Sequence, residues 1–211
     1  MNIIDKLIYF YSTDKIQEFN QTLNKENNKE IIIQLIKQFI NDKNSSTARE
    51  RTILYECNYQ PLLSKLGYDG QNEEGFCEVK LSNCDTSKQK PEKLNGSGSY
   101  SDYTWDRYHK HLKENPTLLI GGFIDGKLIY IFKIKYDSPK LKTHFYNKLY
   151  NYFGDSHLPR KPNHYLRSLQ FNYKSYIDDA ELIYIASKTK LEYYKSYIVK
   201  DLYERLLSEC K

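Results

Sequence analysis

The sequence predicts an α/β (α+β) fold in which a mixed central β-sheet is flanked by helices. Stretches with helical spacing of apolar residues alternate along the chain with short strand-like runs. Two β-rich runs flank Asp125-Gly126, a dipeptide that is typical of hairpin turns. At 211 residues the chain is long enough to bury a sizeable core in one compact unit.

Residues 1–45 are expected to form a helical segment that packs on the core, and residues 46–211 to form the main domain. Apolar residues recur at helical spacing from the first turn onward. Asp14 is expected to cap a second helix, and Asn28 to open a third one with a broad apolar stripe. Nothing in this segment points to chemistry.

The next helix is expected to begin at Ser46. Glu50 shares one helical face with Ile53 and Leu54, which follow it by three and four residues, so its carboxylate should point towards the sheet. A carboxylate on an apolar face is unfavourable unless it is paired or bound to a cation. The alternative is an exposed glutamate near a helix start, stabilised by the helix dipole.

Residues 66–82 have the pattern of two short strands joined by a polar turn. Glu78 and Lys80 are two residues apart and therefore share one face of the second strand, with apolar residues on the other face. Asp69 precedes the turn and comes beside Glu78 if the strands pair. Two carboxylates beside an ammonium group suit a hard divalent cation. The alternative is a solvated strand face with a cross-strand charge pair.

The pattern of Asp69 followed by Glu78-x-Lys80 resembles the PD-(D/E)xK nuclease superfamily, to which many type II restriction endonucleases belong. Tyr68 stands where that pattern usually has a proline. The resemblance implies a restriction-endonuclease-like core with catalytic roles for these three residues, and Glu50 is the candidate for a further acidic residue. By the resemblance, one or two Mg²⁺ ions are held by Asp69, Glu78 and the Val79 carbonyl.

The activity implied by the resemblance is that of a type II site-specific deoxyribonuclease. Such an enzyme is a Mg²⁺-dependent, sequence-specific endonuclease that hydrolyses phosphodiester bonds of double-stranded DNA and leaves 5′-phosphates. A palindromic target would imply a homodimer. The sequence has no Gly-x-Gly-x-x-Gly, Walker or Gly-x-Ser-x-Gly pattern that would point to another class of enzyme.

Two basic loops are the expected DNA contacts. Residues 83–100 have no apolar periodicity and end in a Gly/Ser tract, and we expect them to form a flexible loop that leads into a helix capped by Ser101 or Asp102. Residues 155–164 are basic and contain two prolines. The expected contact residues are Lys88, Lys90, Lys93, Asn95, Gly96, Ser97, Ser99, Tyr100, Tyr103, Arg107, Arg160 and Lys161. Both loops could instead be solvated linkers.

The remaining elements follow from periodicity. Strands are expected on either side of Asp125-Gly126, a helix from Pro139 to Tyr152, and one long helix over residues 189–210. Further strands are expected over residues 165–173 and 182–186. His109 and His111 lie two residues apart on a helix, so they cannot share a metal, and both are expected to face solvent.

The composition indicates which partner, metal chemistry and location to expect for the protein. The net charge of +5 is compatible with a polyanionic partner. The four cysteines have no C-x-x-C spacing, so free thiols are expected rather than a zinc site. The sequence shows neither a signal peptide nor a long apolar run, so we expect a soluble cytoplasmic protein with no membrane contact. Two other functions stay open: a non-enzymatic nucleic-acid-binding protein that uses residues 83–101 and 155–164, and an interaction protein built on the helical ends.

Overall fold

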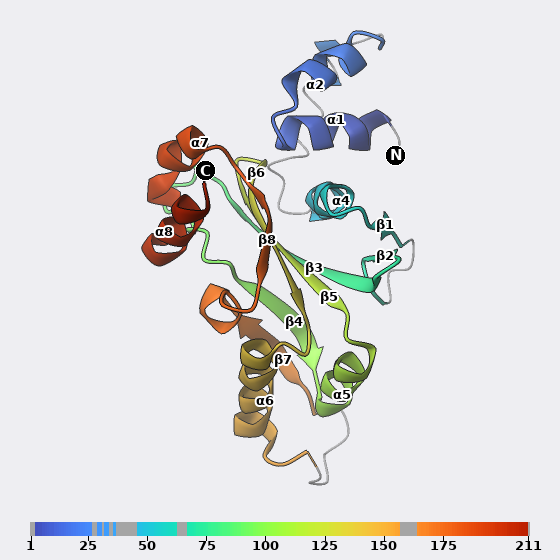
Figure 1. Cartoon of the computed structure of the whole chain (residues 1–211), viewed down its shortest axis with the longest axis vertical. Helices are drawn as coiled ribbons and strands as arrows, with labels where there is room; N and C mark the ends of the chain where they lie inside the picture. The colour runs from blue at the N-terminus through green and yellow to red at the C-terminus, as the bar shows by residue number, and fades with distance from the viewer. Residues whose placement is uncertain are drawn as a thin grey trace.

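The computed structural model describes residues 3–26, 29–30, 32–33, 36, 46–62, 67–156 and 164–210. Its centre is a six-stranded mixed sheet in the order β1-β2-β3-β5-β6-β8, and β4 and β7 form a separate two-stranded sheet (Figure 1). The strands are β1 (Gln60–Pro61), β2 (Gly70–Asn72), β3 (Gly75–Cys84), β4 (Gly98–Tyr103), β5 (Thr117–Ile124), β6 (Lys127–Lys135), β7 (Leu166–Phe171) and β8 (Glu181–Ile185). The predicted α/β class with a mixed central sheet is confirmed.

The helices lie on both sides of this sheet and at its ends (Figure 1). They are α1 (Ile3–Ser12), α2 (Ile16–Leu23), α4 (Ser46–Glu56), α5 (Trp105–Glu114), α6 (Pro139–Phe153), α7 (Lys188–Tyr193) and α8 (Lys200–Glu209). None of the helices within the described part of the chain is both long and apolar enough to span a membrane.

The centre of the sheet is the predicted hairpin. Strands β5 and β6 pair antiparallel, and every residue of β5 is buried. Asp125 and Gly126 join them with φ angles of 49° and 72°, the left-handed conformation that a tight two-residue hairpin turn requires. On its other side β5 pairs in parallel with β3, which places Glu78 beside Leu118 and Lys80 beside Ile120.

The two faces of the sheet bury separate apolar clusters. Ile53 and Leu54 of α4 pack on one face, against Val79 of β3 and Leu119 of β5. The opposite face carries the larger cluster, which includes residues of α5, α6, α8 and the β4–β7 sheet. The strand predicted over residues 165–173 is therefore confirmed as β7, but it pairs with β4 and lies outside the central sheet.

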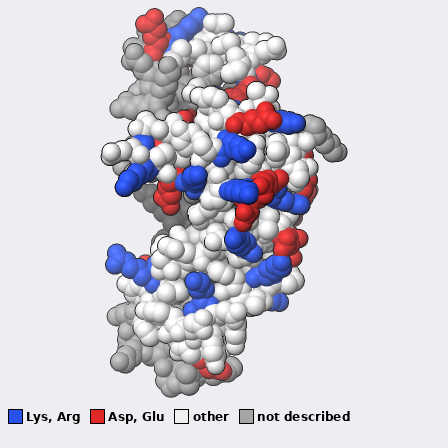
Figure 2. Space-filling model, turned by 90° about the vertical axis from the view of Figure 1, so that its left-hand side faces the viewer, with Lys and Arg blue, Asp and Glu red and all other residues white. Residues whose placement is uncertain are grey.

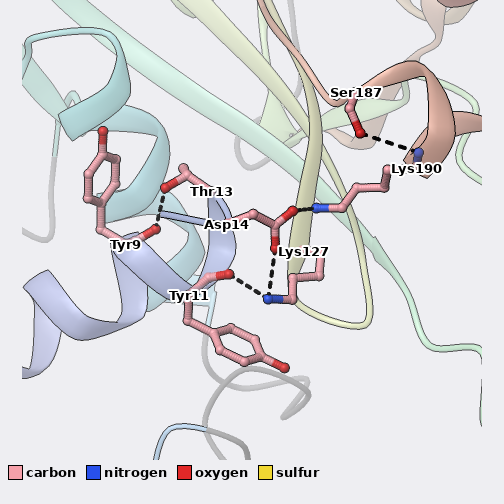
Figure 3. A network of polar contacts seen from close by, with 7 residues as sticks. All are labelled: Tyr9, Tyr11, Thr13, Asp14, Lys127, Ser187 and Lys190. Carbon is pink, nitrogen blue, oxygen red and sulfur yellow. Dashed lines mark hydrogen bonds and ion pairs between the residues drawn. The ribbon is translucent and has the colours of Figure 1, made fainter. Parts of the chain in front are cut away.

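The first two helices contact the rest of the chain through polar side chains. Tyr9 donates a hydrogen bond to Glu56 of α4 at 2.7 Å. The carboxylate of Asp14 forms ion pairs with Lys127 of β6, at 3.0 Å, and with Lys190 of α7 (Figure 3). Asp14 therefore does not cap α2 as predicted. It adopts φ 57° in the turn before that helix, and its side chain neutralises two partly buried lysines.

The loop predicted over residues 83–100 is shorter than expected: residues 85–97 contain no helix or strand, but both ends of the predicted loop belong to strands. Cys84 still belongs to β3, Leu94 is buried, and β4 begins at Gly98. Leu94 exchanges backbone hydrogen bonds with two residues near the C-terminus, since its N–H donates to Tyr197 O and its carbonyl accepts from Val199 N. The order in this segment comes from distant partners that a local sequence pattern does not reveal.

Two predicted helices differ from the observed ones in where they begin or end. Strand β4 runs through Ser101 and Asp102 to Tyr103, and Thr104 caps α5 by accepting a hydrogen bond from Arg107 N at 3.2 Å. The long helix predicted over residues 189–210 is divided into α7, a short 3₁₀ turn and α8. The division falls at Ile198, which forms a β-bridge with Leu94 and therefore has extended backbone. The third N-terminal helix, predicted from Asn28, falls largely outside the described residues.

Candidate functional site

Glu50 reaches the site from helix α4, which lies very close to the sheet. Two glycines permit this approach: a Cβ at Gly70 would lie 2.6 Å from the Leu54 side chain, and one at Gly121 would overlap the Ile53 side chain. Ile53 and Leu54 are fully buried. Since Glu50 precedes them by three and four residues, it lies on the side of α4 that faces the sheet.

Asp69 lies where the pairing of β2 and β3 ends. Its N–H donates to the Cys77 carbonyl at 3.0 Å, which continues the antiparallel ladder by one step. Its carboxylate Oδ2 accepts a hydrogen bond from Val79 N at 2.7 Å. The side chain thus satisfies the first N–H of β3 that lies beyond the β2 ladder, and this bond fixes the carboxylate against the strand.

Glu78 and Lys80 lie side by side on β3, as the alternation predicted. Their side chains form an ion pair of 2.7 Å and are only 14% and 15% exposed. Lys80 Nζ also lies 4.3 Å from the centre of the Tyr100 ring, within the range of a cation–π interaction. Strand β4 reaches this position because Gly98 has no side chain: a Cβ there would be 2.9 Å from Lys80 Cβ.

The charges of these residues are coupled. Burial, followed by the negative charges of Asp69 and Glu78, raises the pKa of Glu50 to about 7. Burial and the charge of Glu78 raise the pKa of Asp69 to about 6, against the opposing effect of the hydrogen bond from Val79. Glu50 of α4 and Asp69, the residue before β2, therefore hold their protons more tightly than ordinary carboxyl groups do, because each is buried and feels the negative charge of Glu78.

The donor chemistry fits Mg²⁺ in part. Within the described residues, no group of three or more His, Cys, Asp or Glu side chains is placed so that it could hold a metal ion by itself. Mg²⁺ is commonly held by only one or two carboxylates together with waters and substrate phosphates. Asp69 and Glu78 offer two carboxylates, and each uses one oxygen in a hydrogen bond to Val79 or Lys80. The excess negative charge beside Glu50 is the kind of environment that a bound cation stabilises.

A cleft of about 610 Å³ lies next to this cluster. Glu50, Val79 and Lys80 line it, whereas Asp69 and Glu78 do not. Further lining residues come from the segment before and at the start of β4, and from α6 and β7. They include Asn95, Ser97, Gly98, Ser99, His144, Lys148, Gln170 and Asn172. The cleft thus brings together parts of the chain that are distant in sequence.

The residues predicted to contact DNA fall into separate groups. Asn95, Ser97 and Ser99 line the cleft. The lysines of the same segment are exposed and do not line the cleft: Lys88, Lys90 and Lys93. Arg160 and Lys161 lie outside the described residues.

The aromatic residues predicted to contact DNA are part of the core. Tyr100 is 1% exposed and Tyr103 is fully buried. The Tyr103 hydroxyl is hydrogen-bonded to His111 Nδ1 at 2.7 Å, so His111 is also buried and does not face solvent as predicted. Gly96 is buried as well, against Tyr173 and Tyr176. The Arg107 guanidinium lies 5.2 Å from the centre of the Tyr103 ring and donates to Ser101 O. These side chains are therefore occupied by intramolecular contacts.

Sequence reasoning missed His144, Lys148 and Gln170. They lie on an amphipathic helix and a short strand whose local patterns show nothing unusual. Only the packing of α6 and β7 beside β3 brings them to the cleft. No protein-family model matches the sequence, and a search of curated proteins gives no significant match.

Proposed function

We propose that the protein is a Mg²⁺-dependent endonuclease of the type II restriction class, which cleaves double-stranded DNA and leaves 5′-phosphates. The proposal rests on one arrangement: Asp69 accepts a hydrogen bond from Val79 N, Glu78 and Lys80 form an ion pair on the same strand, and the charges of Asp69 and Glu78 raise the pKa of Glu50, which lines an open cleft together with Lys80. The arrangement supports the PD-(D/E)xK resemblance at the level of local geometry. The proposal includes a homodimer, since a two-fold assembly suits a palindromic target.

The carboxylates and the lysine have distinct roles in this proposal. Asp69 and Glu78, with the Val79 carbonyl, would hold one or two Mg²⁺ ions. A bound ion lowers the pKa of a water molecule and neutralises charge on the phosphate. Lys80 would orient the attacking water, because its ammonium group is held between Glu78 and the face of Tyr100. Glu50, with its pKa raised to about 7, is suited to accept a proton from that water near neutral pH.

The direct test is cleavage of plasmid DNA, methylated and unmethylated, in Mg²⁺ and in EDTA. We expect Mg²⁺-dependent cutting, and ends that a ligase rejoins without prior phosphorylation. Glu78→Gln and Lys80→Ala should each lower the rate by about 10²-fold or more, as the loss of one transition-state contact typically does. Glu73→Gln removes an exposed carboxylate in the β2–β3 turn and serves as the matched control.

A second measurement separates metal binding from cleavage. A bound ion stabilises the folded state by about 2.7 kcal/mol at a concentration 100 times its dissociation constant. Mg²⁺, or Ca²⁺ as a non-catalytic substitute, should therefore raise the melting temperature of the wild type and of Glu73→Gln, but not of Glu78→Gln. If Glu78→Gln cuts as fast as the wild type, the site assignment fails. If the wild type binds DNA but cuts none, the protein is a non-enzymatic nucleic-acid binder.

A further inference from the structure

The cleft beside Glu50 and Lys80 continues along helix α6. A second hollow of about 520 Å³ shares His144 with the cleft, and a third of about 340 Å³ shares Lys148 and Gln170 with it. The three hollows are therefore adjacent along α6, and together we call them the α6–β7 groove. Along α6 its lining residues run from Pro139 to Tyr152. Thirteen helical steps correspond to about 20 Å.

The length of the groove favours a nucleic-acid strand over a mononucleotide as its ligand. The phosphates of one strand of B-DNA follow one another at a rise of about 3.4 Å along the helix axis, so a groove of this length spans several successive phosphates. A mononucleotide would fill only a fraction of it. The cleft that Glu50 and Lys80 line adjoins both other hollows, so a strand lying along the groove passes the proposed catalytic cluster.

The lining of the groove is polar and carries charges of both signs, with Glu50 and Glu92 in the cleft and Lys80, Lys140, Lys148 and Lys174 among the lining residues of the three hollows. The second and third hollows have no acidic residue among their described lining residues. Amide side chains recur along the groove, from Asn147 and Asn151 on α6 to Gln170 on β7. Amides donate hydrogen bonds to phosphate oxygens and also reach base edges. On the face shown in Figure 2, the lower half is mostly uncharged and carries several separate basic side chains and few acidic ones.

Lys148 is the lysine whose charge is available. Lys140 forms an ion pair with Asp178, and Lys174 with Asp201 at 3.6 Å. Lys148 is exposed and forms no ion pair with any residue that the structure describes. It lines both the cleft and the third hollow, so its side chain borders the part of the groove that adjoins Glu50 and Lys80.

His144 fixes the two sides of the groove relative to each other. Its Nε2 lies 2.9 Å from the backbone carbonyl of Gln170, which can only accept, so Nε2 carries the hydrogen. This bond joins α6 to β7 directly below the cleft. The imidazole thereby fixes the two walls of the groove relative to each other.

We infer that the α6–β7 groove holds the phosphodiester backbone of the DNA strand that enters the catalytic cluster, and that Lys148 pairs with a phosphate near the reacting one. The inference depends on the proposed function for the reaction, but the binding itself requires no metal. It assigns substrate contacts to a helix and a strand that the two basic loops do not include.

The test is fluorescence anisotropy with a labelled DNA duplex, in EDTA, over a series of salt concentrations. Lys148→Gln should weaken binding and lower the slope of log affinity against log salt by about 1, which is the loss of one phosphate contact. Lys142→Gln is the matched control, because Lys142 is an exposed lysine of the same helix that lines none of the three hollows. It should bind like the wild type.

The outcomes separate this inference from the proposed function. Equal binding by the two variants overturns the inference, even if plasmid DNA is cut. A selective effect of Lys148→Gln supports it, even if no DNA is ever cut. Absence of binding to duplex DNA at low salt overturns it as well. Circular dichroism of both variants verifies that the fold is retained.

Discussion

Val79 and Asp69 are joined by a hydrogen bond in which the backbone N–H of Val79 donates to the Asp69 carboxylate at 2.7 Å. The carboxylate replaces a backbone acceptor at the end of the β2–β3 ladder. Its pKa is nevertheless raised to about 6 by burial and by the charge of Glu78. One side chain therefore combines a structural contact with an unfavourable charge, and substitutions can separate the two.

Asp69→Asn and Asp69→Ala should differ in stability. Asparagine keeps an oxygen that accepts from Val79 and removes the repelling charge, so we expect the free energy of unfolding at pH 8 to equal or exceed that of the wild type. Alanine leaves a partly buried N–H without its partner and should lower it by about 1–3 kcal/mol. Urea denaturation measures both. Equal destabilisation by the two variants would show that the charge, and not the hydrogen bond, supports the strand end.

Glu50→Gln should change how stability depends on pH. The pKa of Glu50 is about 7 in the folded protein, above its ordinary value, so the folded state binds the proton more tightly than the unfolded state does. Stability is therefore lost as pH rises from about 4.5 to 7. Because Glu50 is partly exposed, we expect Glu50→Gln to gain about 1–2 kcal/mol over the wild type at pH 8.

The Glu50→Gln comparison requires denaturation curves at pH 5 and pH 8 in the absence of divalent ions. At pH 5 the variant and the wild type should have nearly the same stability, since Glu50 is already protonated in the fold. Glu73→Gln, whose side chain is exposed, should show no such difference. A Glu50→Gln variant that is less stable than the wild type at pH 8 would exclude the repulsion described here.

Gly98→Ala should disturb Lys80. A Cβ at this position would overlap the Phe171 ring and lie 2.9 Å from Lys80 Cβ, so β4 must move away from β3. We expect a loss of stability of about 1–3 kcal/mol from overpacking, together with reduced DNA cleavage. Ser101→Ala, at an exposed position of the same strand that does not line the cleft, should have neither effect. Cleavage at the wild-type rate by Gly98→Ala would separate the placement of β4 from the function of Lys80.

Tyr103→Phe should weaken the core and leave DNA binding unchanged. The Tyr103 hydroxyl lies 2.7 Å from His111 Nδ1 and 2.5 Å from the Tyr136 hydroxyl, and all three side chains are buried. Burial lowers the pKa of His111 to about 3, so the imidazole is neutral and depends on this bond. Loss of the hydroxyl should lower the free energy of unfolding by about 1–3 kcal/mol. Weaker DNA binding at unchanged stability would restore Tyr103 as a DNA contact.

The sequence by itself determined the elements whose pattern is local. The hairpin at Asp125-Gly126 follows from two residues that tolerate positive φ between β-rich runs. The positions of Glu78 and Lys80 on one face of β3 follow from the two-residue period of a strand. The position of Glu50 on the sheet-facing side of its helix followed in the same way from helical spacing. In the structure, the charges of Asp69 and Glu78 raise the pKa of Glu50. These features need no knowledge of distant residues.

Only the tertiary structure decided which segments became ordered and which side chains line the cleft. Leu94 is fixed by backbone hydrogen bonds to residues about one hundred positions later in the chain, so a polar segment that resembles a loop is folded into the core. Tyr100 and Tyr103 are buried because β4 pairs with β7, whereas His144 and Lys148 reach the cleft because α6 packs beside that pair. Long-range pairing depends on contacts between distant segments, and the periodicity of a single segment does not encode its partner.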